Sequence, residues 1–132
     1  MPHATGPFDV KLAPQPVDAG GGDGIGRLLL DKRFHGALDG TSRGQMLGYR
    51  NDALKSAGYV AIERFEGTLE GRAGGFVLQH LGSMARGAMS LDIRIVPDSG
   101  TAGLEGIAGT MRIDIAPGGA HTYVLDYTLA TG

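Results

Sequence analysis

Hydrophobic and polar residues alternate along most of this chain, and the alternation is clearest between residues 57 and 82. From Tyr59 to Leu69, one set of alternate positions is mainly apolar, whereas the other set is polar from Arg64 onward. A period of two places the two sets on opposite faces of a β-strand. The sequence therefore predicts a strand with one solvent-facing side and one side facing a core or cavity, with Glu63 among the apolar residues.

A glycine-containing run at 71–75 breaks this pattern, and the alternation resumes at 76–81. The two alternating segments are expected to form an antiparallel hairpin. Gln79 and His80 are the polar residues of the second strand, and they lie on its opposite faces. A turn centred in the middle of the run places Gln79 on the face of Glu63, whereas a tighter turn at its start places His80 there. Both registers stay open, because a slip of one residue moves every side chain to the other face.

The same alternation recurs along the rest of the chain between clusters of turn-forming residues. The other expected strands are 7–13, 26–38, 42–49, 88–96, 103–115 and 121–129, with turns at 40–42, 97–100 and 116–119 and a helical turn or loop at 51–55. An eight-stranded antiparallel sheet that bends at glycines closes most naturally into a barrel, which removes exposed edges. We therefore expect an all-β fold: one closed antiparallel barrel of about eight strands in up-and-down order, spanning residues 1–132, with a flexible loop at 14–24.

Two of these strands carry the plainest inward face, because their apolar residues alternate with charged ones. The residues expected to point to one interior are Met89, Leu91, Ile93, Ile95, Met111, Ile113 and Ile115.

Composition removes several classes of function. The chain has 132 residues, 24 of them glycine, and a net charge of -2, which gives no general attraction to nucleic acid or to an anionic membrane. It has no cysteine, so disulfides and thiolate chemistry are excluded. No apolar run approaches the roughly 20 residues of a membrane span, and the first eight residues do not form a secretory signal. We expect a cytoplasmic protein with neither a nucleic-acid nor a membrane partner.

Six segments together resemble a bacterial family, the domain-of-unknown-function family 3224, over the chain from about residue 8 to the end. They are GYVAIE at 58–63, FEGTLEGR at 65–72, GFVLQH at 75–80, VPDSGT at 96–101, HTY at 121–123 and DY at 126–127. The family is similar in architecture to allene oxide cyclase, an antiparallel barrel that cyclises an unsaturated fatty-acid epoxide. The resemblance implies an allene oxide cyclase-like barrel. It transfers neither activity nor catalytic residues, because no cyclase motif aligns and fold alone does not give function.

Glu63 and His80 are the candidate catalytic residues. A carboxylate on an apolar strand face loses solvation, so its pKa is expected to rise above about 4.3 unless an arginine lies close, and it can then act as a general acid or base. His80 is suited to shuttle protons near neutral pH. The alternative for each is structural: a paired glutamate at the barrel mouth and a hydrogen-bonded histidine. His35, His80 and His121 lack the spacing of a ligand motif, so neither a metal nor a cofactor is expected.

The lumen of an eight-stranded barrel is just wide enough for side chains or for one small ligand. The candidate ligand-binding residues are Tyr59, Phe65, Gln79, His121, Tyr123 and Tyr127. Aromatic residues of this kind serve equally as core packing. Three functions follow: binding of a small apolar molecule without chemistry, which we favour; an isomerase or cyclase with acid-base residues in the pocket; and a purely structural homo-oligomer. Assembly into a homo-oligomer is expected in any case.

Overall fold

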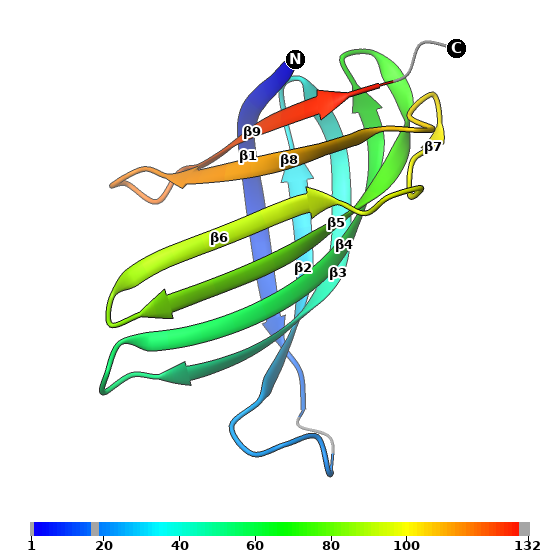
Figure 1. The fold of residues 1–132 in the computed structure, drawn as a ribbon. Coiled ribbons are helices and arrows are strands. Elements are labelled where there is room, and N and C mark those ends of the chain that lie inside the picture. Colours follow the sequence, from blue (N-terminus) through cyan, green and yellow to red (C-terminus); the bar gives the residue numbers. More distant parts are fainter. Residues whose placement is uncertain (1, 17–18, 130–132) are drawn as a thin grey trace.

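The computed structural model describes residues 2–16 and 19–129, and these residues form β-strands joined by turns (Figure 1). The strands are β1 (His3–Pro14), β2 (Gly26–Phe34), β3 (Leu38–Asn51), β4 (Ser56–Leu69), β5 (Arg72–Ala85), β6 (Ala88–Ile95), β7 (Thr101–Ala102), β8 (Ala108–Ile115) and β9 (His121–Thr128). Within the described ranges no segment is a helix long and apolar enough to cross a membrane.

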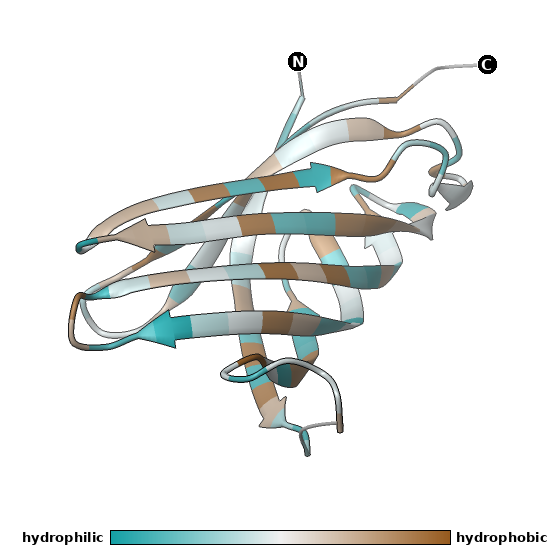
Figure 2. Cartoon of the chain, turned by 60° about the horizontal axis from the view of Figure 1, so that its bottom comes forward, coloured by the Kyte–Doolittle hydropathy of each residue, from teal (hydrophilic) through white to brown (hydrophobic). Residues whose placement is uncertain are grey.

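Eight of the strands close into a ring in the order β1–β2–β3–β4–β5–β6–β8–β9, and β9 returns to β1. Every neighbouring pair is antiparallel, and the short β7 pairs with β5 outside the ring. Hydrophilic and hydrophobic bands alternate along the ribbons, as a period of two requires (Figure 2). The predicted all-β, closed antiparallel barrel of eight strands is confirmed.

Two predicted boundaries are wrong. The turn expected at 40–42 lies inside β3, because the chain already reverses at 35–37, between β2 and β3. Gly40 does not mark a turn: it lies where β4 approaches so closely that a Cβ would overlap the carbonyl of Glu66. The strand expected at 103–115 begins only at Ala108. The predicted flexible loop at 14–24 includes residues 17–18, which lie outside the described residues, and Pro14 belongs to β1.

The central hairpin turns one residue earlier than the tighter turn expected at Gly71-Arg72, and it puts the same residues on the inner face. Glu70 and Gly71 form a two-residue turn, with φ values of 47° and 87°, and this left-handed pair matches the twist of the strands. Leu69 therefore pairs with Arg72, and the register runs on to Ala61 opposite His80. His80 consequently faces the interior with Glu63, whereas Gln79 faces outward.

The end of the barrel that carries the β2–β3 and β4–β5 turns is packed with side chains, and we call it the closed end. Its aromatic core joins Phe34 to Phe65 and to Tyr123, with ring centroids 5.8 and 5.3 Å apart, and Phe65 to Phe76 at 5.1 Å. Leu104, in the segment before β8, is also fully buried in this core. This aromatic packing fills the interior of the barrel at the closed end.

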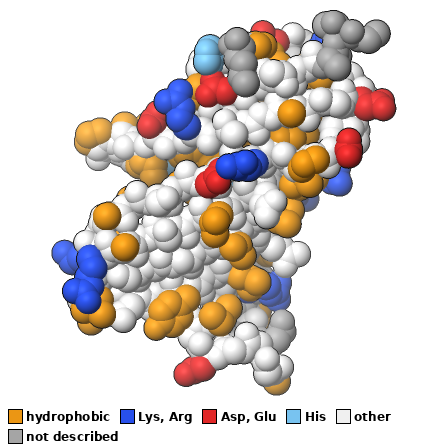
Figure 3. Space-filling view, viewed as in Figure 1, with side chains coloured by type: hydrophobic (Ala, Val, Ile, Leu, Met, Phe, Trp, Pro, Cys, Tyr) orange, Lys and Arg blue, Asp and Glu red, His pale blue; other side chains and the backbone are white. Residues whose placement is uncertain are grey.

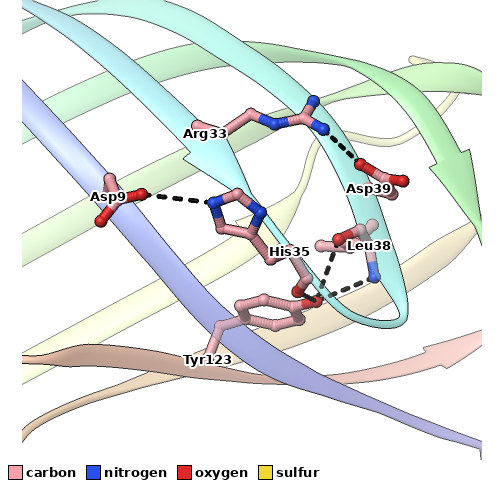
Figure 4. Close-up of polar contacts among 6 residues, drawn as sticks. All are labelled: Asp9, Arg33, His35, Leu38, Asp39 and Tyr123. Atoms are coloured by element: carbon pink, nitrogen blue, oxygen red, sulfur yellow. Dashed lines mark hydrogen bonds and ion pairs between the residues drawn. The ribbon is translucent and has the colours of Figure 1, made fainter.

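The hydroxyl of Tyr123 on β9 links that strand to the turn between β2 and β3 at the closed end. The Tyr123 hydroxyl accepts a hydrogen bond from the backbone N–H of Leu38 at 2.8 Å and donates one to the carbonyl of His35 at 2.7 Å. Figure 4 shows this hydroxyl against the turn between β2 and β3, which it fixes to β9, two strands away from β2 in the ring. On the outer side of the same turn, the Arg33 guanidinium lies 2.6 Å from the Asp39 carboxylate.

The opposite end, which carries the β3–β4, β5–β6 and β8–β9 turns, is open. The ladder between β6 and β8 has only two residue pairs, Ile93 with Met111 and Arg94 with Thr110, so the two strands separate beyond Ile93. Figure 3 shows a notch on the left of the molecule, where β8 leaves β6. We call this opening between β6 and β8 the seam.

The predicted inward face of β6 and β8 is confirmed in part. Ile93, Ile95 and Met111 are buried, as expected. Three further residues on the same face are exposed: Met89 at 79%, Leu91 at 43% and Ile115 at 63%. They lie beyond the last ladder pair, where no facing strand covers them. Leu12, on the inward-facing set of β1, is likewise 51% exposed.

Candidate functional site

A cluster of polar side chains lies buried inside the barrel, between the closed end and the open end. Lys32 comes from β2, Ser42 from β3, Glu63 from β4 and His80 from β5, and none of them is more than 6% exposed. Each occupies an inward position of its strand, so the alternation that builds the barrel also brings the four together. Glu63 therefore faces the interior, as the sequence predicted, and Lys32 and Ser42 are its unpredicted neighbours.

The Glu63 carboxylate is the centre of this polar cluster. Its Oε2 accepts a hydrogen bond from Lys32 Nζ at 2.8 Å and lies 3.1 Å from His80 Nε2. Its Oε1 accepts a hydrogen bond from Ser42 Oγ at 3.1 Å. Among the residues that the structure describes, every buried side-chain nitrogen or oxygen has a partner. The cluster is thus a complete hydrogen-bonded network, which holds its members in fixed orientations.

The expected rise in the pKa of Glu63 is wrong in sign. Burial alone raises this pKa, but the hydrogen bond from His80 and the charge of Lys32 together outweigh burial. They hold the pKa of Glu63 below its ordinary value of 4.5, so the carboxylate is ionised at neutral pH. The nearby cation is a lysine on β2 rather than an arginine.

Lys32 lies on aromatic rings of the barrel interior. Its Nζ is 5.4 Å from the centroid of the Phe8 ring and 6.0 Å from that of Phe34. An ammonium at these distances is attracted to the ring faces, so the contact offsets part of the cost of burying the charge. The alternation of β2 contains the signal for this residue, because Lys32 shares its parity with Leu30 and Phe34. The leucine run before it obscured which face is buried.

A second chain of contacts leads from Glu63 toward the open end. His80 Nε2 lies 3.1 Å from the carboxylate, and the Tyr59 hydroxyl lies 3.4 Å from the other ring nitrogen, Nδ1, which is an acceptor in the tautomer that carries its proton on Nε2. Tyr59 is half-buried and comes four residues before Glu63 on β4, nearer the open end. Burial, and then the negative charge of Glu63, raises the pKa of the Tyr59 phenol above 10.0. Tyr59 is therefore a neutral hydroxyl at the open side of the cluster.

Gly82 fixes the position of the Tyr59 ring. Tyr59 and Gly82 are direct partners in the β4–β5 ladder, and a Cβ at Gly82 would overlap the ring. The ring lies across the glycine, as aromatic residues do when they cover a glycine on a neighbouring strand. In this position the Tyr59 hydroxyl lies 3.4 Å from His80 Nδ1.

The remaining aromatic candidates lie in the closed end. Phe65 and Tyr123 are fully buried within the aromatic core. Tyr127 is also buried, and its hydroxyl donates to Glu70 Oε1 at 3.1 Å. Of the aromatic candidates in the described part of the chain, Tyr59 alone hydrogen-bonds to a member of the cluster: its hydroxyl contacts His80, which in turn contacts Glu63.

The two polar candidates outside the cluster lie apart from it. Gln79 is exposed on the outer face, and His121 is half-buried with its ring 5.2 Å from that of Phe8. His35 pairs with Asp9 at 3.2 Å on the exterior (Figure 4). Across residues 2–16 and 19–129, no group of three His, Asp or Glu side chains is placed to hold a metal ion.

Two hollows lie on the surface outside the polar cluster, and the first is formed by the loop that joins β1 to β2 at the open end. One, of about 730 Å³, is lined by residues 20–26 of a single loop. The other, of about 250 Å³, lies at the closed end beside Leu69, Glu70 and Tyr127. Neither is lined by Glu63 or His80, and a depression made by one loop has no converging polar groups of the kind a ligand site requires. The polar cluster and the adjacent open end remain the candidate site.

Comparison with known proteins identifies a family and a solved structure that are similar to this barrel. A family described as "Protein of unknown function (DUF3224)" matches residues 4–127. A crystal structure of a protein of unknown function from that family, from Shewanella oneidensis MR-1, superposes with a TM-score of 0.91 at 45% sequence identity. The alignment covers 100% of this chain and 99% of the Shewanella chain. No curated protein matches the sequence.

Proposed function

This chain belongs to the DUF3224 family, described only as proteins of unknown function, and we propose that it binds a small, mostly apolar molecule that carries an oxygen atom. The molecule lies in the open end of the barrel, with its oxygen toward the Tyr59 hydroxyl. The binding reaction itself needs no cofactor, no nucleic acid and no membrane. On the sequence alone, we place the protein in the cytoplasm.

The observation that carries this proposal is the exposure of large apolar side chains on the inward face at the open end. Leu12, Met89, Leu91 and Ile115 are between 43% and 79% exposed, although each continues an inward-facing set. Covering apolar surface stabilises a complex by about 25 cal/mol for each Å² removed from water. A small apolar molecule that enters through the seam would cover these side chains in the way a facing strand covers Ile93.

The Tyr59 hydroxyl supplies the polar end of the proposed site. It is the outermost member of the Glu63–His80–Tyr59 chain, and its half-buried ring lies at the open side of the cluster. A phenol held in this way can donate a hydrogen bond to a carbonyl or ether oxygen, and one such bond contributes about 1 kcal/mol. A ligand with one oxygen at the end of an apolar body matches this combination of groups.

The same chain of contacts supports a second candidate function, an isomerase or cyclase. An ionised Glu63 holds His80 with its Nδ1 toward Tyr59, so Nδ1 can accept the phenol proton. The resulting phenolate can take a proton from a carbon next to a carbonyl, and return of a proton to a different carbon completes an isomerisation without a net change in atoms. The allene oxide cyclase-like architecture, which the family resemblance implies, belongs to this second candidate.

Titration with an uncharged naphthalene ketone dye, whose fluorescence reports an apolar environment, tests binding. We expect saturable binding that weakens at least about tenfold in Leu91→Lys, because the lysine charge occupies the apolar wall. Thr110→Lys, on the outer face of β8, is the matched control and should bind as the parent does. Tyr59→Phe should weaken binding about fivefold through the lost hydrogen bond. Absence of saturable binding to the parent, or equal binding by Leu91→Lys, contradicts the proposal.

The same dye separates binding from chemistry, because it carries exchangeable hydrogens next to its carbonyl. In D₂O, proton abstraction by the site would replace these hydrogens with deuterium, which mass spectrometry detects. Exchange faster than in buffer, lost in Tyr59→Phe and in His80→Gln, supports the isomerase or cyclase. Binding without faster exchange supports the function that we favour.

A further inference from the structure

The outer surface of the barrel carries an apolar area that the proposed ligand site does not use. We call it the outer patch, and it consists of the outward-facing residues Leu29, Leu47, Val60, Ile62 and Leu81 on β2–β5. Their side chains are between 40% and 61% exposed. Figure 3 shows hydrophobic side chains gathered over the lower half of this face, where β3, β4 and β5 run side by side.

The rest of the outer surface is polar rather than apolar. The outward positions of β6, β8, β9 and β1 are mainly polar, and they include Asp92, Arg94, Thr110, Arg112, Asp114, Thr122, Asp9 and Lys11. Exposed apolar residues are thus concentrated on one half of the barrel and are not a general property of its strands. A contiguous exposed area of this kind marks an interaction surface.

The strand register arranges the outer patch in rows. Leu47, Val60 and Leu81 are direct neighbours across β3, β4 and β5. The next row toward the closed end places Ile62 between Gln45 and Gln79. Both rows are symmetric about β4 in chemical type, with an apolar residue on each side in the first row and an amide on each side in the second.

Charges of opposite sign flank the first row. Arg27 on β2 pairs with Leu47 in the ladder, and Asp92 on β6 pairs with Leu81. The row therefore runs from a cation through three apolar residues to an anion. A rotation of 180° about an axis along β4 exchanges the two ends of the row and so brings Arg27 opposite Asp92, which also accepts a hydrogen bond from Arg94 Nε at 3.1 Å.

We propose that a second copy of this chain docks on the outer patch, with a two-fold axis that runs along β4. In this dimer Val60 meets Val60 of the second copy, Leu47 meets Leu81, and Arg27 lies beside Asp92. Gln45 meets Gln79 in the adjacent row, where each amide can both donate and accept. A two-fold interface of this type is self-complementary, which is the condition for a closed dimer.

The area of the outer patch is adequate for such a dimer. Its five exposed side chains present on the order of 500 Å² of mainly apolar surface, at the upper end of what a typical monomer leaves uncovered. A stable interface buries about 800 Å² on each partner, so the patch with its polar rim accounts for the greater part. The small net charge of -2 adds little repulsion between two copies.

Introducing a positive or a negative charge at Val60 tests both the association of the two copies and the two-fold symmetry of the dimer. Val60 is half exposed, so a charged side chain should not disturb the fold, yet it would lie against its own copy on the axis. We expect the parent to sediment as a dimer, and Val60→Lys and Val60→Glu each to raise the dissociation constant at least about 100-fold. An equimolar mixture of the two variants should recover a dimer that contains one of each.

Thr122→Lys is the control, because it adds the same charge to the polar half of the outer surface and should stay dimeric. A parent that sediments as a monomer overturns the proposal, as it would if the outer patch served a different protein or a membrane. Dimers that persist in Val60→Lys, or variants that dissociate but do not recover when mixed, also overturn it. None of these results affects ligand binding, because the proposed ligand site lies inside the barrel.

Discussion

Replacing Glu63 with glutamine should cost far more stability than the loss of one hydrogen bond. Glutamine preserves the shape of the side chain, and its oxygen can still accept the bond from Ser42 Oγ. Its amide N–H group, however, would face Lys32 Nζ and His80 Nε2, which are both donors to the carboxylate in the parent. Glu63→Gln therefore leaves the buried Lys32 charge without a counter-charge.

The expected size of the effect follows from the burial of the pair. The Lys32 side chain is 6% exposed and that of Glu63 is 0% exposed, so solvent does not screen the change. Removing one partner of a buried ion pair costs about 3–5 kcal/mol, a large part of the 5–15 kcal/mol by which domains are usually stable. At a urea dependence of about 2 kcal/mol per molar, the midpoint of unfolding should fall by roughly 2 M.

Equilibrium unfolding in urea, followed by circular dichroism, measures this shift. A second substitution, Lys32→Met, removes the stranded charge from the Glu63→Gln background and should recover at least about half of the lost free energy of unfolding. A loss below about 1 kcal/mol in Glu63→Gln would refute the claim that the buried ion pair stabilises the fold strongly, since ion pairs exposed to solvent already contribute up to about 1 kcal/mol. The same claim would be refuted if the double variant lost the sum of the free energies of unfolding that the two single substitutions lose.

Three further predictions concern pH, the limits of the core and the closed end. Because the folded-state pKa of Glu63 lies below 4.5, its charge stabilises the fold above about pH 4.5, and this stabilisation is lost as the pH falls through the folded pKa. The difference in unfolding free energy between the parent and Glu63→Gln should therefore be constant at higher pH and shrink in acid. A difference that does not change with pH would contradict the lowered pKa of Glu63. Ile93→Asp should prevent folding, whereas Leu91→Asp, beyond the last ladder pair, should cost less than about 1 kcal/mol, and equal thermal melting of the two would show that the open end is misassigned. Tyr123→Phe leaves the buried N–H of Leu38 without its partner and should cost about 1–3 kcal/mol in urea unfolding; a change of a few tenths would mean that the hydroxyl is dispensable.

The fold could be predicted because a period of two is a local property of the sequence. Alternation along each segment defines the strands, and hairpin-length turns then leave little choice but an up-and-down barrel. The errors arose where a residue serves a distant part of the chain. The local pattern predicts a turn at Gly40, but the close approach of β4 is what requires a glycine there, and no local pattern reveals that approach. The same kind of pattern predicts a strand at Leu104, which instead packs in the closed end before β8 begins.

The candidate site could be predicted only in part, for the same reason. Alternation placed Glu63 on an inward face, but the residues that set its charge state come from other strands. Lys32 follows three consecutive leucines that conceal the phase of β2, and Ser42 was assigned to the false turn. The choice between Gln79 and His80 depended on one residue of turn length, which was decided by the left-handed conformation of Glu70 and Gly71.

The most direct test of the central claim, a ligand site in the open end, is a map of where an apolar ketone binds. Backbone amide resonances recorded during titration with the naphthalene ketone dye would provide that map. We predict saturable shifts at the inward positions of the open end, including Leu12, Tyr59, Gly82 and Leu91, with the closed end unchanged. Shifts confined to the outer patch, or no saturable shifts at all, would contradict the claim.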